Sequence, residues 1–357
     1  MTRLLAAAVL AVLVAVPLTA EAQRNDRAAT VMSRNLYFGA DLTPAIGVTD
    51  PGAFTAAVTG IYAVVQASDI PGRAEALATE IAAAAPDLIG VQEAVIWRTQ
   101  VPADFSPTPN ATDVAFDFLQ RLLDGLAARG TPYTVVAEHI TNDLEAPTFT
   151  ASGLRDVRLT DREVILARTV RKANDPIVLT NVQSGVFAAQ LTFPVPGGSY
   201  TQNRGWLSVD VALRGAHFRF VTTHLDPEGV ANPVQEAQGL ELLAGPANTT
   251  LPVVLVCDCN SRADGTGTAT YGDLIAGGFA DAWSARWRRA DGFTCCQDED
   301  LRNPTTALDQ RIDLVLVRGR AHVRHATVTG EDETERTPEG LWPSDHAGLT
   351  ATIQFKP

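Results

Sequence analysis

The sequence predicts an α/β fold in which a mixed β-sheet arrangement is covered by helices on its outside. Most apolar runs are short, rich in Val, Ile and Thr, and bounded by turn residues, as strands are. Two of these runs, residues 206–213 and 218–223, are separated only by Arg214-Gly215-Ala216-His217, which predicts an antiparallel hairpin. Because a hairpin interrupts the alternation of strands and helices, a mixed arrangement fits better than a doubly wound parallel sheet.

The predicted elements follow one another along the chain without a linker, a repeat or a low-complexity tract. Residues 73–85 form a predicted helix that opens after Pro71-Gly72 and stops at Pro86. Residues 101–112, with three prolines, are expected to be an inserted loop. We therefore expect one domain over residues 23–357. The predicted strands are 30–34, 87–92, 134–138, 162–167, 206–213, 218–223, 252–257, 312–317 and 348–355, and the other predicted helices are 115–128 and 233–243.

The first 22 residues have the pattern of a secretory signal peptide. Arg3 precedes the apolar run 4–18, and Ala20-Glu21-Ala22 offers small residues at a cleavage site. The run is shorter than the roughly 18 residues of a spanning helix, which leaves an uncleaved anchor as the less favoured alternative. We expect a secreted protein, extracellular or periplasmic after cleavage near Ala22.

The chain is acidic, with a net charge of −13 that cleavage after Ala22 would not change. This charge argues against the broad basic face of a non-specific duplex binder, although a local cationic groove or a bound divalent metal could still admit a polyanion. No protein partner is indicated, and we expect a monomer.

All four cysteines lie in the second half of the sequence, at Cys257, Cys259, Cys295 and Cys296. In an exported protein an even number of cysteines favours disulfides. A bond between neighbours within either pair would be strained, so we expect the first pair to bond to the second in some order. A zinc site is the alternative, but Cys-x-Cys and Cys-Cys lack the usual Cys-x2-Cys spacing.

A polar pair follows the apolar run 253–256. Residues two apart in an extended chain share a face, so Asp258 and Asn260 should point together, and Cys257 and Cys259 should point the other way. A carboxylate beside an amide can orient a water molecule as a nucleophile. The structural alternative is a turn in which both side chains cap backbone groups.

Other polar residues stand where strands should end. Glu93, Asp345 and the amide of Asn35 supply the oxygen-rich set that Mg²⁺ accepts while it keeps several waters. Asp313 lies in an otherwise apolar strand and needs a partner, which is either Arg311 or His346. A carboxylate on His346 would raise the pKa of this imidazole and make it a cation or acid at a phosphate.

Taken in order, these motifs resemble the endonuclease/exonuclease/phosphatase family over nearly the whole mature chain. The resemblance rests on Asn35-Leu36-Tyr37, Gln92-Glu93, Thr223-His224-Leu225, Asp258-Cys259-Asn260, Arg311-Ile312-Asp313 and Ser344-Asp345-His346. It implies a four-layer α/β sandwich, with two mostly antiparallel mixed sheets face to face and helices outside. One departure is that Cys257 and Cys259 stand where the family usually has a glycine and an aromatic residue.

The resemblance also implies roles for these residues. Glu93 would be the principal Mg²⁺ ligand, with Asn35 and Asp345 completing or bordering the metal shell. Asp258 and Asn260 would activate the attacking water, and Asp313 would hold His346. His224 would contact the phosphate or assist the leaving group. Arg162 and Arg204 are candidate substrate contacts, with surface salt bridges as the alternative.

The expected activity is Mg²⁺-dependent hydrolysis of a phosphate ester, most simply a phosphodiester, with Mn²⁺ or Ca²⁺ as substitutes. Nucleic acid, a phospholipid headgroup and a small phosphoester remain alternative substrates, which correspond to a nuclease, or to a sphingomyelinase or phosphoinositide-type enzyme. A catalytically inactive binding protein on the same fold is the alternative of another class. A serine hydrolase is disfavoured, since no Gly-x-Ser-x-Gly motif is present.

Overall fold

The computed structural model describes residues 27–357 except 107, 171–174 and 289, and the predicted signal peptide at residues 1–22 lies outside the described residues. The strands are β1 Ala28–Asn35, β2 Leu88–Gln92, β3 Ile96–Gln100, β4 Asp113–Asp117, β5 Tyr133–Thr150, β6 Gly153–Arg168, β7 Ile177–Val186, β8 Thr192–Val195, β9 Gly198–Thr201, β10 Gly205–Leu213, β11 Ala216–His224, β12 Val253–Asp258, β13 Ala280–Asp281, β14 Asp313–Arg318, β15 Ala321–Thr329 and β16 Gly348–Phe355. The α-helices are α1 Pro51–Ala67, α2 Ile70–Ala84, α3 Phe118–Ala128, α4 Asn232–Ala244, α5 Thr270–Ala276 and α6 Ala282–Arg286, with single 3-10 turns at Thr43–Ala45 and Glu333–Glu335.

Two large sheets form the centre of the molecule. One has the order β15-β16-β1-β2-β6-β3-β4, with β5 paired to β6, and the other has the order β13-β14-β12-β11-β10-β7. The pairs β1–β2 and β11–β12 are parallel, and the other pairs within these two sheets are antiparallel. Strands β8 and β9 form a separate two-stranded sheet. The predicted hairpin is confirmed as β10–β11.

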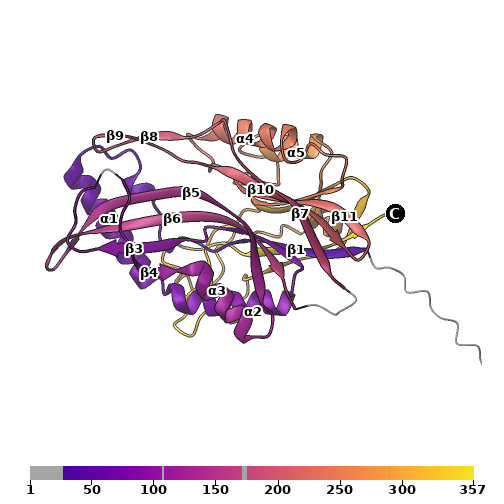
Figure 1. The fold of residues 1–357 in the computed structure, drawn as a ribbon, viewed down its shortest axis with the longest axis horizontal. Helices are drawn as coiled ribbons and strands as arrows, with labels where there is room; N and C mark the ends of the chain where they lie inside the picture. Colours follow the sequence, from indigo (N-terminus) through magenta and orange to yellow (C-terminus); the bar gives the residue numbers. More distant parts are fainter. Residues whose placement is uncertain (1–26, 107, 171–174, 289) are drawn as a thin grey trace, which may run out of the picture.

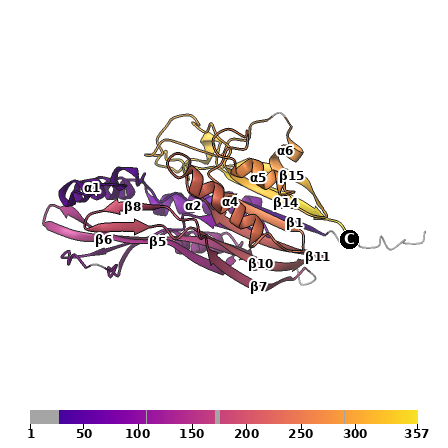
Figure 2. The same ribbon diagram turned by 90° about the horizontal axis from the view of Figure 1, so that it is seen from above.

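The two sheets pack face to face, with helices on both outer sides (Figure 1). Val31, Ile165, Phe220 and Val256 belong to the core between the sheets, and Phe218 stacks on Phe355 across it with ring centroids 4.5 Å apart. Apolar residues of the opposite strand faces pack under α1, α2 and α3 on one side and under α4 and α5 on the other. This period-two alternation produces the expected four layers. Figure 2 shows the same layers from above.

Gly90 is the position in β2 where the other sheet lies too close for any side chain. A Cβ at Gly90 would collide with Thr222 of β11 and Val256 of β12. The glycine therefore allows the two sheets to approach closely just before the residues that end β2 and β12.

The predicted strands all fall within observed strands to within one residue at their ends, but several elements were not predicted or were longer than expected. The expected helix 115–128 begins only at Phe118, because residues 113–117 pair with β3 and Asp117 caps the helix by accepting from the Gln120 N–H at 3.1 Å. Strands β5 and β6 form a hairpin far longer than the predicted runs 134–138 and 162–167. Helix α1, which opens with the cap Asp50 and Pro51, was not predicted.

The expected disulfide pairing is wrong. The bonds join Cys257 to Cys259 and Cys295 to Cys296. Cys257 and Cys259 lie in the core beneath α4 and α5, with their Cα atoms 5.0 Å apart, a separation that a disulfide spans. Cys296 instead lines a surface cavity, so the two pairs lie in different surroundings and bond within themselves.

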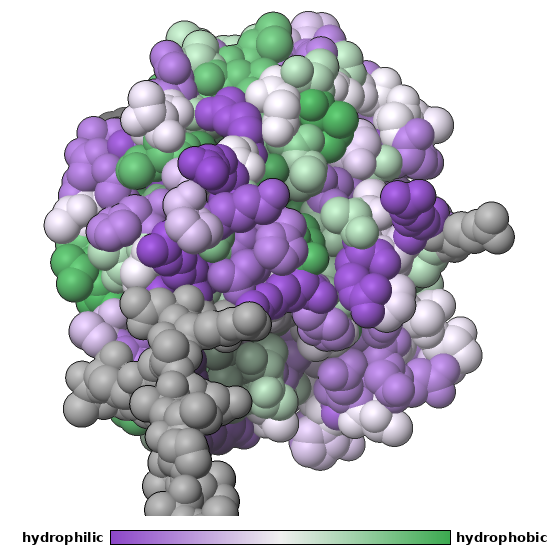
Figure 3. Space-filling model, turned by 90° about the vertical axis from the view of Figure 1, so that its right-hand side faces the viewer, coloured by the Kyte–Doolittle hydropathy of each residue, from purple (hydrophilic) through white to green (hydrophobic). Residues whose placement is uncertain are grey.

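The end of the molecule that carries the C-terminus has polar and apolar residues interspersed on its surface (Figure 3). Among the described residues no single helix is long and apolar enough to cross a membrane, and only the bent pair α1 and α2 would meet both criteria together.

Candidate active site

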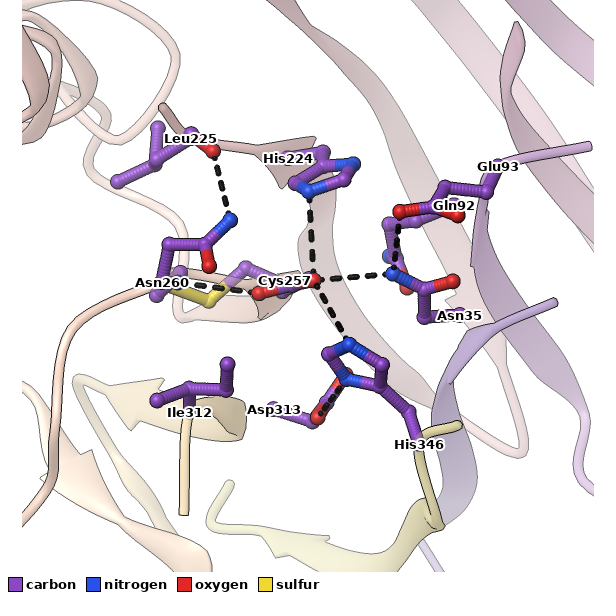
Figure 4. A network of polar contacts seen from close by, with 12 residues as sticks. Asn35, Gln92, Glu93, His224, Leu225, Cys257, Asn260, Ile312, Asp313 and His346 are labelled. Atoms are coloured by element: carbon purple, nitrogen blue, oxygen red, sulfur yellow. Dashed lines mark hydrogen bonds and ion pairs between the residues drawn. A yellow bond between two sulfur atoms is a disulfide. The ribbon is translucent and has the colours of Figure 1, made fainter. Parts of the chain in front are cut away.

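Strand ends from both sheets bring the polar residues together at one edge of the sandwich. Asn35 ends β1 beside Gln92 of the parallel strand β2, and His224 ends β11 beside Asp258 of the parallel strand β12. Asp258 in turn pairs with Asp313, which begins the antiparallel strand β14. Residues far apart in the sequence therefore meet because the register aligns the ends of their strands (Figure 4).

Asp258 lies at the centre of this group. Its Oδ2 accepts from Asn35 Nδ2 at 3.0 Å and lies 3.3 Å from His224 Nε2 and 3.8 Å from His346 Nε2. Its Oδ1 accepts from the Asn260 N–H at 3.0 Å. Burial disfavours the ionised carboxyl, but the two imidazoles and these hydrogen bonds hold the pKa of Asp258 below its ordinary value. Asp258 is therefore an ionised acceptor, suited to orienting a water molecule.

His346 belongs to a close carboxylate–imidazole pair. Its Nδ1 lies 2.8 Å from Asp313 Oδ2. Burial alone would lower the pKa of His346, but Asp313, Asp345 and Asp258 raise it well above its ordinary value. Burial raises the pKa of Asp313 to about 6, against the lowering effect of His346. At neutral pH this pair is an imidazolium held by a carboxylate.

His224 belongs to a looser pair with a buried glutamate. Its Nδ1 faces Glu163 Oε1 at 3.5 Å, which is beyond a good hydrogen bond. Burial, followed by the charge of Arg204, lowers the pKa of His224 to about 3. Burial and Asp161 raise the pKa of Glu163 well above its ordinary value. His224 is therefore neutral at neutral pH.

Glu93 follows β2 in a left-handed backbone conformation, with φ +56°, which is uncommon outside glycine and asparagine. Its carboxylate accepts from Asn35 Nδ2 at 3.0 Å and from the Phe38 N–H at 2.9 Å. Burial, then Asp345 and Asp161, raise the pKa of Glu93 to about 8. Burial also raises the pKa of Asp345.

This donor set fits a hard divalent cation. Glu93 is buried and Asp345 is partly exposed, and the charge of Asp345 raises the pKa of Glu93, a repulsion that a bound cation would relieve. Oxygen or nitrogen atoms of Glu93, His224 and Asp258 also lie within 4.8 Å of one another. Asn35 turns its nitrogen toward the carboxylates, since its Oδ1 accepts from the Tyr37 N–H at 2.9 Å, so it borders the metal shell through hydrogen bonds.

Two buried arginines from the strand and helix beneath the site hold its loops in place. Arg73 of α2 donates to Pro343 O at 3.0 Å and to Tyr37 O at 3.1 Å. Arg34 of β1 pairs with Glu80 of α2 at 2.9 Å and donates to the backbone oxygen of His346. Helix α2 thus ties the segment after β1 to the segment before β16. Sequence reasoning assigned no role to either arginine.

The group opens into a cavity of about 510 Å³. Its polar lining includes Glu93, Arg204, His224, Asp258, Asn260, Asp345 and His346. A phosphate ester could enter here and meet the carboxylates and imidazoles together.

A model of the Endonuclease/Exonuclease/phosphatase family matches residues 60–346. The chain belongs to this family. Family members are generally phosphoesterase or nuclease hydrolases that use divalent metal ions. No curated protein sequence matches this chain.

Solved structures of the endonuclease/exonuclease/phosphatase fold resemble this chain at low sequence identity. A family protein from Bacteroides thetaiotaomicron is 16% identical, with a TM-score of 0.56 over 92% of this chain and 98% of that one. Humanized D. rerio TDP2 is 15% identical, with a TM-score of 0.54 over 92% and 99%. D. rerio TDP2 in complex with a single strand DNA product is 15% identical, with a TM-score of 0.52 over 92% and 100%. These likenesses show the fold.

Of the two arginines predicted as substrate contacts, the structure brings only Arg204 to the cavity. Arg162 donates to Ala94 O at 2.7 Å and pairs with Asp117 at 2.8 Å, outside the cavity lining. Arg162 is thus held in ion pairs outside the cavity lining, and its role as a substrate contact stays a prediction. Arg204 lies 3.8 Å from both Glu163 and Asp226.

Glu163 is the residue beside His224 that sequence reasoning missed. It stands in the buried part of β6, where the charged residues Asp161-Arg162-Glu163 precede the apolar run Val164-Ile165-Leu166. The same signal identified Asp313, whose partner proves to be His346 while Arg311 pairs with Asp281 at 2.6 Å. A charge within a buried strand was thus a usable signal at both positions.

Proposed function

We propose that this protein is an exported, monomeric, Mg²⁺-dependent phosphodiesterase that hydrolyses its substrate by in-line attack of water on phosphorus. The observation that carries the proposal is the ionised Asp258 held between two imidazoles and beside the acidic pair of Glu93 and Asp345. Membership of a family of phosphoesterase and nuclease hydrolases supports the reaction class. Export rests on the N-terminal sequence pattern, and two disulfides are compatible with an oxidising compartment.

Each side chain has a task in this reaction. Asp258 accepts a hydrogen bond from the attacking water, and the Asn260 N–H holds the other oxygen of that carboxylate. The water oxygen forms a bond to phosphorus as the bond to the ester oxygen breaks, and the water proton ends on the departing alcohol or the surrounding buffer. His346, kept charged by Asp313, stabilises the charge that develops on the phosphoryl oxygens.

Glu93 and Asp345 would hold the cation, with the Asn35 amide fixing the orientation of Glu93. A bound Mg²⁺ withdraws charge from a phosphoryl oxygen. His224, being neutral, acts as a hydrogen-bond donor toward Asp258 or the substrate and not as an acid.

Methyl p-nitrophenyl phosphate is a suitable first substrate, because it contains one phosphodiester and no recognition group. We expect hydrolysis that EDTA abolishes and that Mg²⁺, Mn²⁺ or Ca²⁺ restores to different degrees. Glu93→Gln should lower the rate and raise the Mg²⁺ concentration for half-maximal activity, whereas Glu75→Gln on exposed α2 surface should change neither. Full activity in EDTA would contradict the proposed role of the metal.

A nuclease is the second candidate, since D. rerio TDP2 is seen with a single strand DNA product on a similar fold. The net charge of −13 speaks against extended nucleic acid. Parallel assays with supercoiled DNA, sphingomyelin and phosphoinositides compare the candidates directly. No turnover of any of them, together with Mg²⁺ binding undetectable by calorimetry, would instead favour an inactive binding protein.

A further inference from the structure

The cavity continues from the polar centre into an apolar part built by other elements. Its apolar lining includes Phe54 and Val58 of α1, Leu144 of β5, Leu159 of β6, and Phe193 and Val195 of β8. Helix α1 and the β8–β9 hairpin lie at the same end of the molecule (Figures 1 and 2). None of these six side chains belongs to the polar centre, so the apolar part is a separate region of the same cavity.

The β8–β9 hairpin forms one wall of the apolar part, and its residues belong to none of the three large hydrophobic cores. It pairs with neither large sheet, and within it Phe193 lies against Tyr200, with ring centroids 5.6 Å apart. Phe193, Val195 and Leu191 are all partly exposed toward the cavity. Apolar surface left open to water in a concave site is stabilised when an apolar group covers it.

The charges at the cavity oppose a long polyanion. Asp41, Glu145 and Glu299 line it, and all three are at least partly exposed. Among the described lining residues the one arginine is Arg204, which is buried between Glu163 and Asp226. Phosphates of a polynucleotide that continued past the active site would meet carboxylates without arginines or lysines to neutralise them. A single phosphate bound at the polar centre would avoid this repulsion.

We propose that the apolar part of the cavity is a subsite for a hydrocarbon substituent, and that the substrate is a single-phosphate ester carrying such a group. This inference rests on the proposed function and names the substrate class of the same site. The polar centre binds the phosphate, while α1 and the β8–β9 hairpin enclose the hydrocarbon.

A series of alkyl p-nitrophenyl phosphates tests the subsite, because the reacting phosphorus and the leaving group stay constant while the alkyl group changes. From methyl to butyl to octyl, below their micelle concentrations, kcat/KM should rise about threefold for each added methylene until the apolar part is filled. A phenyl ester in the same series distinguishes a ring from a chain. Equal kcat/KM for methyl and octyl esters would overturn the subsite while leaving the proposed function intact.

Substitution of one wall residue should reduce this selectivity without disturbing the main cores. Phe193→Ser should lower the octyl-to-methyl ratio of kcat/KM about tenfold and leave the methyl ester unchanged. Val178→Ala is the matched control, because Val178 is exposed on β7 and does not line the cavity. An unchanged ratio in Phe193→Ser would contradict the subsite.

Binding of n-alkylphosphonates, whose carbon–phosphorus bond is not hydrolysed, separates the subsite from catalysis. In calorimetry with Mg²⁺ present, octylphosphonate should bind at least tenfold tighter than methylphosphonate, and Phe193→Ser should reduce the difference about tenfold. This result in a protein that hydrolyses no ester would support the subsite and count against the proposed function. Equal binding of the two phosphonates, or hydrolysis of a single-stranded oligonucleotide with a higher kcat/KM than the octyl ester, would overturn the inference.

Discussion

The two imidazoles that flank Asp258 each lie beside a second buried carboxyl group, but they differ in charge. His346 lies 2.8 Å from Asp313 and has a raised pKa, whereas His224 lies 3.5 Å from Glu163 and has a pKa lowered to about 3. The pKa of Asp313 is raised only to about 6, whereas burial and Asp161 raise the pKa of Glu163 well above its ordinary value. A carboxylate beside a histidine therefore does not by itself make an imidazolium. The distance and the other charges nearby decide which imidazole carries a proton.

The largest expected difference is between removal of the charged and of the neutral imidazole. His346→Ala should lower kcat/KM for methyl p-nitrophenyl phosphate by about 10³- to 10⁴-fold, because a cation that stabilises phosphoryl charge is lost. His224→Ala should lower it by about 10- to 100-fold, because a neutral hydrogen-bond donor is lost. Steady-state kinetics on both variants, with folding checked by circular dichroism, measure the difference. Equal losses would refute the asymmetry.

The two carboxylates behind the imidazoles should differ in the same direction. Asp313→Asn removes the charge that holds the proton on His346, so we expect kcat/KM to fall about 100-fold and the alkaline limb of the pH–rate profile to move to lower pH. Glu163→Gln removes a carboxyl whose ionised form burial already disfavours, so the fall should stay below about fivefold. A larger loss in Glu163→Gln than in Asp313→Asn would show that Glu163 is ionised.

Stability should depend on pH with opposite sign for the two histidines. The folded pKa of His346 is above its unfolded value near 6.5, so its contribution is complete below that value and is lost as pH rises through the folded pKa. The folded pKa of His224 is about 3, so the unfolded chain takes up a proton first and stability falls as pH drops from about 6.5 toward 3. Between pH 7 and pH 5 the His224 effect is about 2 kcal/mol.

Urea unfolding of EDTA-treated protein checks these signs. His224→Ala should flatten the loss of stability on the acid side, and His346→Ala should flatten the loss on the alkaline side. The same slope in both variants would contradict the assignment.

The smallest effect on catalysis is expected at Arg162, which lies outside the cavity. Arg162→Ala breaks the ion pair with the partly exposed Asp117 and should lower the free energy of unfolding by about 1–2 kcal/mol. The kcat/KM of the folded variant should stay within about twofold of wild type. A tenfold loss at unchanged stability would return Arg162 to the substrate-binding residues.

The fold and much of the site could be predicted because polar residues at strand ends are visible in the sequence. Asp258, His224 and Asn35 each stand at the end of a strand that the sequence predicts, so their meeting follows once the register is known. Glu93 is brought to the site by a left-handed turn that the sequence does not indicate. Arg34 and Arg73 look like surface charges until the tertiary structure buries them.

The disulfides and the cavity walls could not be predicted for a related reason. Cys257 and Cys259 lie in the core beneath α4 and α5, whereas Cys296 lines the cavity, and local spacing does not show this separation. Helix α1 is poor in strong helical signals beyond Asp50 and Pro51, so its contribution to the apolar lining was not foreseen. These features arise from packing between distant segments, whereas the strand ends are local.

The charge states of His224 and His346 are the most direct test of this account, and nitrogen NMR of the imidazole rings measures them. In metal-free protein at pH 7, with resonances assigned from the His224→Ala and His346→Ala variants, His346 should show two protonated ring nitrogens and His224 one. Two neutral rings, or two charged rings, would contradict the account.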